Sequence, residues 1–409
     1  MTVAAFERSA LVWKRGESVY ANIRSLPVKR SLGTIQGETK VISSFKGREP
    51  AVKMAPNISG ENRCVDSKFE VQPNELVELP EKILETEKTE GVLPVKETKG
   101  EGWFSFKTEL IWLNIIAISL VHLIAFYGIL TFPVFECKLT LLWGTLLGQL
   151  AGFGVTGGVH RLWTHRSYKA KLPLRIILLV CYAMAGQNTI YDWVRDHRVH
   201  HKFSETDADP HNSNRGFFFA HVGWLMMRKH PEVIRRGRQV DMSDILADPV
   251  VVFGEKYFLP LKLFFCFIFP TLLPIYCWNE TWYRSIMAQV FVRYILTLNF
   301  TWCVNSAAHL WGTKPYDNKI QPAENLGVAL VALGEGWHNY HHVFPWDYKA
   351  AELGNYRVNT TTMLIDMFAK IGWAYDLKQP SKDLVKRIVE KKGDGSHPLW
   401  GEVPEPKAE

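Results

Sequence analysis

Four long apolar runs constrain the fold of this chain more than any other feature of its sequence. They lie at 111–132, 139–159, 257–278 and 285–305. Each is long enough to cross a bilayer, which takes about 20 helical residues. A spanning segment must satisfy its own backbone polar groups, and runs of this length do so as helices. We therefore expect an all-α integral membrane protein with four transmembrane helices.

Three features within these runs carry further expectations. Gly144, Gly148 and Gly152 recur at four-residue intervals in the second run, a spacing typical of close helix packing. The third run contains prolines that should kink it. The fourth contains Arg293, and a charge inside a span is costly. We expect that arginine to face protein, water or a polar ligand.

The connections between the runs predict the topology. The short turns 133–138 and 279–284 lie on one side of the membrane. The N-terminal segment, residues 160–256 and the segment from 306 share the other side. The loop 160–256 is rich in arginine and lysine, which favours the cytosol for that side. Both termini are then cytosolic, and the loop forms a helical cap on the cytosolic face.

Composition divides the chain into three parts. Residues 1–102 are polar and lack a sustained apolar period, which predicts a disordered cytosolic tail. Residues 103–395 form the membrane domain, and 396–409 a flexible C-terminal tail. The net charge of +7 suits anionic lipid or an acidic partner. It does not indicate nucleic acid, because the aromatic residues lie in the membrane runs and not in a basic groove.

Histidines supply the chemistry. The chain has fourteen, of which eight fall in three short clusters within His160–His165, His197–His201 and His338–His342, and a ninth is His309. Neutral imidazole is the commonest metal ligand, and nine suit two ions. We expect each H-x-x-H-H to aim its three imidazoles at one point, because positions i, i+3 and i+4 share a helix face. The five-residue gap in the first cluster does not fit one face, so one of its histidines should lie at a helix end.

The donor set narrows the choice of metal. The six cysteines are scattered without a C-x-x-C pair, which argues against a structural zinc site. Glu335 and His338 have the Glu-x-x-His spacing of soluble di-iron bundles but lack partner motifs. Imidazole suits iron, zinc and copper. The membrane setting and the lack of H-E-x-x-H or G-x-S-x-G motifs favour oxygen chemistry on iron.

Four blocks resemble the signature of animal acyl-CoA desaturases of the stearoyl-CoA desaturase family. They are HRLWTHRSYK at 160–169, DHRVHHK at 196–202, NSAAH at 305–309 and GEGWHNYHH at 334–342. Their order and spacing agree with that family, and the match runs from about Trp103 to about Gly395. The first hundred residues are not covered.

The resemblance implies a di-iron enzyme of the endoplasmic reticulum membrane, with two ferrous ions held in the cytosolic cap. It uses O2 to remove hydrogens from adjacent methylenes of a fatty acyl-CoA, which gives a cis double bond. Δ9 is the family default, and other positions such as Δ11 stay open. Asn305 corresponds to the residue that holds a water at one iron. The implied iron ligands are His160, His165, His197, His200, His201, His309, His338, His341 and His342.

Substrate contacts follow from the same resemblance. The positions that contact coenzyme A are Asn188, Arg195, Asp196, Arg228 and Lys229. Those that shape a kink in the acyl chain are Gln187, Trp193 and Thr301. Gly148 and Gly152 line the far end of the acyl tunnel, where relatives often carry larger residues, so we expect a deeper tunnel. A solvated or lipid-facing basic pair is the alternative for Arg228 and Lys229.

Two further expectations concern partners of the iron site. Asp196 and Glu335 adjoin ligands in sequence and are candidates to fix the imidazole tautomers. No His-Pro-Gly-Gly haem motif occurs, so electrons must come from a separate carrier. In the family this is cytochrome b5 with its NADH-dependent reductase, and the basic cytosolic loop could receive that acidic protein.

Two other classes remain as alternatives. Membrane hydroxylases also carry histidine clusters, but their first cluster usually has another spacing. A non-catalytic lipid-binding or metal-sensing scaffold would tolerate loss of ligand positions, and none is lost here.

Overall fold

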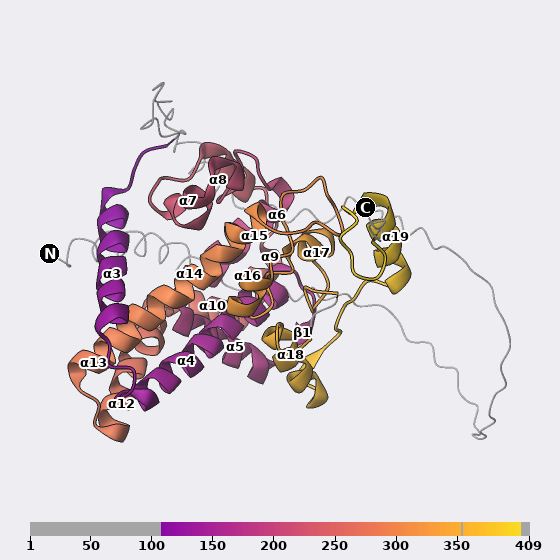
Figure 1. Cartoon of the computed structure of the whole chain (residues 1–409). Helices are drawn as coiled ribbons and strands as arrows, with labels where there is room; N and C mark the ends of the chain where they lie inside the picture. Colours follow the sequence, from indigo (N-terminus) through magenta and orange to yellow (C-terminus); the bar gives the residue numbers. More distant parts are fainter. Residues whose placement is uncertain (1–107, 353–354, 402–409) are drawn as a thin grey trace, which may run out of the picture. The chain divides into compact units, whose positions relative to one another are not determined.

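The computed structural model describes residues 108–352 and 355–401 (Figure 1). Regular structure in these ranges is helical apart from the two-residue strands β1 (Lys169–Ala170) and β2 (Ala374–Tyr375), which pair antiparallel. The tail predicted at 1–102 lies outside the described residues. At the other end, His397 is buried and its Nε2 lies 3.0 Å from Oε2 of Glu352. The folded part therefore extends past residue 395, to at least residue 401.

Four helices are long and apolar enough to cross a membrane, as the sequence predicts: Trp112–Thr131, Lys138–Thr164, Phe258–Trp278 and Trp282–Leu310. The first is α3 alone. The others are composite: α4 (Lys138–Phe153) with η1 (Gly154–Thr164); α11 (Phe258–Lys262), η4 (Leu263–Ile268) and α12 (Phe269–Trp278); α13 (Trp282–Ile286), η5 (Met287–Val292), α14 (Arg293–Asn305) and α15 (Ala307–Leu310).

Shorter helices fill the remainder of the described chain. They are α5 (Leu172–Ala185), α6 (Ile190–Phe203), η2 (Ser213–Arg215), α7 (Phe217–His221), η3 (Gly223–Leu225), α8 (Pro231–Gly237), α9 (Ser243–Ala247), α10 (Pro249–Lys256), α16 (Leu326–Val331), α17 (His338–Val343), α18 (Thr360–Lys370) and α19 (Lys382–Lys392). The largest apolar core surrounds α4, η1 and α5, with Leu147, Val159 and Leu178 among its buried residues.

A sharp bend sets the direction of α6. The axes of α5 and α6 differ by 85°. Gly186, which ends α5, has a φ of +64°, a backbone conformation that residues with a Cβ adopt only at a cost in free energy. The hydroxyl of Thr189 then accepts a hydrogen bond from the backbone N–H of Asp192 and caps the start of α6. The bend therefore turns α6, which carries three of the clustered histidines, away from the line of α5.

Arg293 faces protein, as expected. Its side chain is 5% exposed, Nη1 lies 3.4 Å from the carbonyl of Met184, and Nη2 also donates to the carbonyl of Cys266. The last carbonyls of a helix have no hydrogen-bond donor within that helix, and the Arg293 guanidinium donates to one of them, that of Met184 near the end of α5. The buried charge thus joins α14 to α5 and η4.

Segment η1 is a π-helix, in which each N–H bonds to the carbonyl five residues earlier. It contains three glycines, and Gly154 explains how closely it packs on α5. A Cβ at Gly154 would lie 2.2 Å from the backbone nitrogen of Tyr182 and 2.3 Å from the carbonyl carbon of Cys181. Only glycine allows this contact, which fixes the helix that carries His160.

Gly154→Ala should therefore destabilise the protein by about 1–3 kcal/mol, because the backbone of α5 must move to admit a methyl group. Thermal unfolding of the detergent-purified full chain measures this as a lower Tm. Gly148→Ala is the matched control, since a Cβ there meets only Oγ1 of Thr297, at 3.8 Å. Equal Tm values for the two variants would contradict the close packing of η1 on α5.

Candidate metal centre and acyl cavity

All nine predicted histidines gather in two adjacent clusters. The first cluster consists of His160, His165, His197, His201 and His341, and the second of His200, His309, His338 and His342. Within each cluster every residue offers one nitrogen, and these nitrogens lie within 4.8 Å of one another. Each group of converging imidazoles could therefore hold a metal ion.

The expectation that each H-x-x-H-H aims at one point is wrong. In α6, His197 and His201 join the first cluster while His200 joins the second. In α17, His338 and His342 join the second cluster while His341 joins the first. Neighbouring residues of an α-helix point about 100° apart, so adjacent histidines diverge while the i, i+4 pair stays together. Each helix therefore lies between the clusters and serves both.

The five-residue gap in the first motif is explained by the π-helix. The backbone N–H of His165 donates to the carbonyl of His160 at 3.1 Å, which is the i→i+5 bond of such a helix. The rings of the two residues are 4.8 Å apart, so both reach the same cluster. His165 follows the last residue of η1, as expected for one of the pair. The wider turn was not predicted from the sequence, because the spacing rule holds for α-helices alone.

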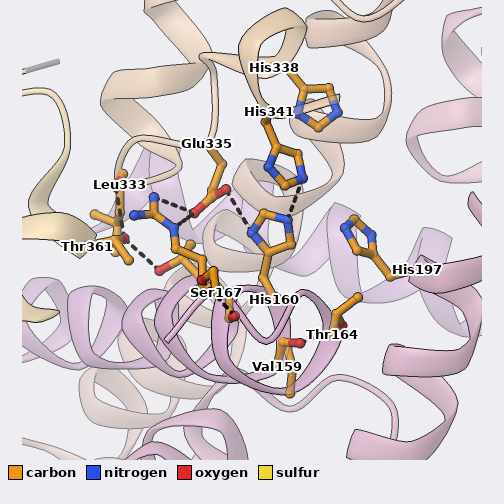
Figure 2. A network of polar contacts seen from close by, with 12 residues as sticks. Val159, His160, Thr164, Ser167, His197, Leu333, Glu335, His338, His341 and Thr361 are labelled. Atoms are coloured by element: carbon orange, nitrogen blue, oxygen red, sulfur yellow. Dashed lines mark hydrogen bonds and ion pairs between the residues drawn. The ribbon is translucent and has the colours of Figure 1, made fainter. Parts of the chain in front are cut away.

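Carboxylates hold three of the imidazoles by Nδ1. Figure 2 shows His160 between Glu335 and His341, and Nδ1 of His160 lies 2.9 Å from Oε2 of Glu335. Nδ1 of His200 lies 2.9 Å from Asp209, and Nδ1 of His309 lies 2.7 Å from Glu205. Each contact turns Nδ1 toward the carboxylate and leaves Nε2 of that ring facing its cluster.

The sequence identified one of these three carboxylates. Glu335 makes the predicted contact, and its Oε1 also accepts from Nη2 of Arg161 at 2.8 Å. Asp196 was expected to do the same and does not. Its carboxylate binds Lys229 and Arg195. Glu205 and Asp209 were missed; the signal that could have found them is a run of acidic residues directly after α6.

Charge and burial leave most of these rings neutral. Burial first, and then the neighbouring imidazoles, lower the pKa well below the ordinary histidine value at six positions: His165, His197, His201, His338, His341 and His342. Burial also opposes charge on His200, but the charge and hydrogen bond of Asp209 outweigh it and raise the pKa of that ring.

The close approach of ring nitrogens fits bound metal ions. Nε2 of His341 lies 3.0 Å from Nε2 of both His160 and His201, and Nε2 of His338 lies 3.0 Å from Nε2 of His309. Neutral imidazoles that bring bare lone pairs together repel one another, and a cation between them removes the repulsion. A nitrogen-only donor set suits iron, zinc or copper.

A cavity of about 720 Å³ reaches the first cluster. It is lined by His160 and His197 at the clusters and extends along α4 past Gly152, Gly148 and Gly144. Most of its wall is apolar. The candidate metal centre thus adjoins a space suited to a long hydrocarbon chain.

The three residues expected to shape a kink are joined by hydrogen bonds. Nε1 of Trp193 donates to Oε1 of Gln187 at 3.0 Å, and Nε2 of Gln187 donates to the hydroxyl of Thr301 at 3.1 Å. All three line the cavity. This series of hydrogen bonds links α6 to α14 along the cavity wall beside the first cluster.

The other predicted substrate residues divide into two groups. Those that line the cavity are Asn188, Asp196, Gly148 and Gly152, and Asn305 lines it too. Among the described residues, the cavity lining does not include Arg195, Lys229 or Arg228. Arg195 and Lys229 both bind Asp196 and so adjoin the cavity through it. Arg228 is exposed and its Nε lies 2.9 Å from Oε2 of Glu109.

Sequence comparisons agree with this geometry. Residues 138–356 match the fatty acid desaturase family model. An acyl-CoA Delta-9 desaturase of Acheta domesticus is 58% identical over 296 residues, which cover 72% of this chain and 82% of the relative. An acyl-CoA Delta(11) desaturase of Spodoptera littoralis is 52% identical over 300 residues, covering 72% and 87%. The stearoyl-CoA desaturase of Homo sapiens is 53% identical over 292 residues, covering 71% and 80%.

The family model spans more than half of the chain, and each of these relatives is matched over most of its own length. Both results agree with the histidine clusters, the apolar cavity and the four membrane-spanning helices. This chain belongs to the fatty acid desaturase family.

Proposed function

We propose that this protein is an acyl-CoA desaturase that introduces a cis double bond at the Δ9 position of a saturated long-chain acyl-CoA. The observation that carries the proposal is the apolar cavity that runs past the first histidine cluster. The Δ9 position is supported by the identity of 58% to a relative with that name, against 53% and 52% to relatives named for Δ12 and Δ11.

The nine clustered histidines would hold two ferrous ions, with Asn305 placing a water at one of them. Bound iron supplies the oxygen chemistry that removes hydrogens from unactivated methylenes. The protein's own part is positional. Glu335, Asp209 and Glu205 orient rings of both clusters through Nδ1. Burial keeps most of the rings neutral and therefore able to donate a lone pair.

The acyl chain would occupy the cavity and bend at Trp193, Gln187 and Thr301. Their hydrogen bonds make this stretch of wall rigid, so one pair of methylenes is held at the first cluster. A chain bent at this point would favour a cis product, because a cis bond continues the bend.

Coenzyme A would lie at the mouth of the cavity. Asn188 and Asp196 line the cavity, and Asp196 fixes the positions of Arg195 and Lys229 through ion pairs. Arg228 follows in sequence, and its exposed ion pair with Glu109 would have to open for it to bind a phosphate. Coenzyme A phosphates are the anions that such a group of cations would bind.

Electrons would come from cytochrome b5 and its NADH-dependent reductase at the endoplasmic reticulum, with both termini of this chain in the cytosol. The exposed side chains of Lys202 and Arg238 support this, because they belong to the basic loop and none of the ion pairs among the described residues involves them. Opposite charge speeds the encounter with an acidic carrier.

Expression of the full chain in yeast that lacks its own desaturase tests the function. We expect a new cis-monounsaturated fatty acid with the bond at Δ9, measured by gas chromatography after derivatisation of the double bond. A bond at Δ11 or Δ12 would overturn the Δ9 assignment alone. A hydroxylated fatty acid would move the protein to the hydroxylase class.

Loss of one ligand from each cluster tests the two-metal proposal. His165→Ala and His309→Ala should each lower the iron content by about half, because each removes a ligand of one cluster only. Elemental analysis of the purified protein measures iron per chain. His230→Ala, outside both clusters, is the control and should keep full iron. Full iron content in both ligand variants would contradict the assignment.

Gly148→Tyr tests the depth of the acyl cavity. Only Oγ1 of Thr297, at 3.8 Å, would lie near a Cβ here, so a tyrosine ring can enter the cavity. We expect shorter acyl chains to become preferred in the fatty acid profile of the yeast strain. Leu146→Tyr places the same ring on the exposed side of α4 and should leave the profile unchanged. An unchanged profile in Gly148→Tyr would show that the chain does not reach this position.

A further inference from the structure

The acyl cavity is not closed on the side of the membrane-spanning helices. Several residues that line it also have exposed side chains. These are Ile129 of α3, Thr145 and Gln149 of α4, and Leu296 and Phe300 of α14. Ile129 is 48% exposed, and Leu296 and Phe300 are each 38% exposed. The cavity is partly open to the outside, and these exposed lining residues mark the stretch of its wall where we place the opening.

Helix α3 forms one side of this opening. The turn 132–137 joins α3 to α4, and the two helices diverge from this turn (Figure 1). One face of α3 is fixed to η5 and α14. Gly128 is packed so closely that a Cβ there would lie 2.6 Å from Sδ of Met287. Ala117 and Val121 of α3 line the cavity.

A polar network holds α3 in this position. Nδ1 of His122 donates to the carbonyl of Ile118 at 2.7 Å, which leaves Nε2 to accept from Nδ2 of Asn299 at 3.1 Å. Oδ1 of Asn299 lies 3.0 Å from Nε2 of His221 in α7. The wall made by α3 is therefore tied to α14 and to α7.

The surroundings of the opening determine what can pass through it. Its rim residues belong to three of the four helices able to cross a membrane, so the opening faces bilayer hydrocarbon and not water. Three of the five rim side chains are apolar. Elsewhere the cavity wall includes Trp193 and the ion-paired carboxylate of Asp196. None of the five rim side chains is charged.

We propose that the cavity opens laterally into the bilayer between α3 and α4, and that fatty acyl chains pass through this opening between the cavity and the membrane. The proposal rests on the proposed desaturase function for the identity of the chain that uses it. Product would then leave by moving its hydrocarbon end sideways into the lipid, while the head group leaves the mouth of the cavity.

Photo-crosslinking tests the opening independently of catalysis. The full chain is placed in nanodiscs of phosphatidylcholine that carries a diazirine at the end of one acyl chain, and labelled residues are mapped by mass spectrometry. We expect labels on Ile295 and Thr297, which line the cavity and are only 7% and 8% exposed. Labels confined to outward residues such as Leu142 and Leu146 would overturn the proposal.

Blocking the rim tests the route of the product. Thr145→Cys and Leu146→Cys are each treated with hexadecyl methanethiosulfonate, and both are compared with treated wild type, whose Cys277 is also exposed. Leu146 is the next residue of α4, 50% exposed, and outside the described cavity lining. We expect a several-fold fall in steady-state turnover for modified Thr145→Cys, with the first turnover preserved, and little change for Leu146→Cys.

Equal steady-state rates in the two modified variants would overturn the lateral route. A wild-type protein that forms no unsaturated product at all would instead overturn the proposed function, and the crosslinking result would still stand as a measure of the opening. The two failures are therefore distinguishable.

Discussion

The structure depends on bringing nine imidazoles within a few ångströms of one another inside the protein. Imidazoles can be buried together at low cost only if the rings stay neutral. Neutral rings still repel one another when the lone pairs of their nitrogens converge. The carboxylates of Glu335, Asp209 and Glu205 resolve part of the conflict, because each turns Nδ1 of one ring outward and leaves Nε2 for a metal. Arg161 in turn balances the buried charge of Glu335.

The helices around the clusters follow from the same requirement. Helices α6 and α17 each lie between the two clusters and give ligands to both. Neither cluster therefore forms unless both of these helices are in place. The π-helical turn of η1 brings His160 and His165 to the same cluster, and the glycine contact of Gly154 with α5 holds that turn. Arg293 then ties α5 to the fourth span. The membrane-spanning helices are thus a scaffold for the site as well as an anchor.

Much of this could be predicted from the sequence. The four spans were found because apolar length is a strong signal, and the nine histidines because their spacing is rare. Their division between two clusters was mispredicted, since a shared helix face was taken to mean a shared target for His197, His200 and His201. The widened helix at His160 and the contacts of Glu205 and Asp209 depend on backbone geometry and tertiary packing, which spacing alone does not encode. Asp196 shows the same limit: adjacency to His197 in sequence did not place its carboxylate on a histidine.

The most direct test of the account is X-ray absorption at the iron edge of the purified, iron-loaded full chain. The account predicts two irons per chain with nitrogen ligands of imidazole type and no sulfur, and loss of imidazole scattering in variants of either cluster. Zinc or no metal in place of iron, or an iron pair bridged by carboxylates in a nitrogen-poor shell, would contradict it.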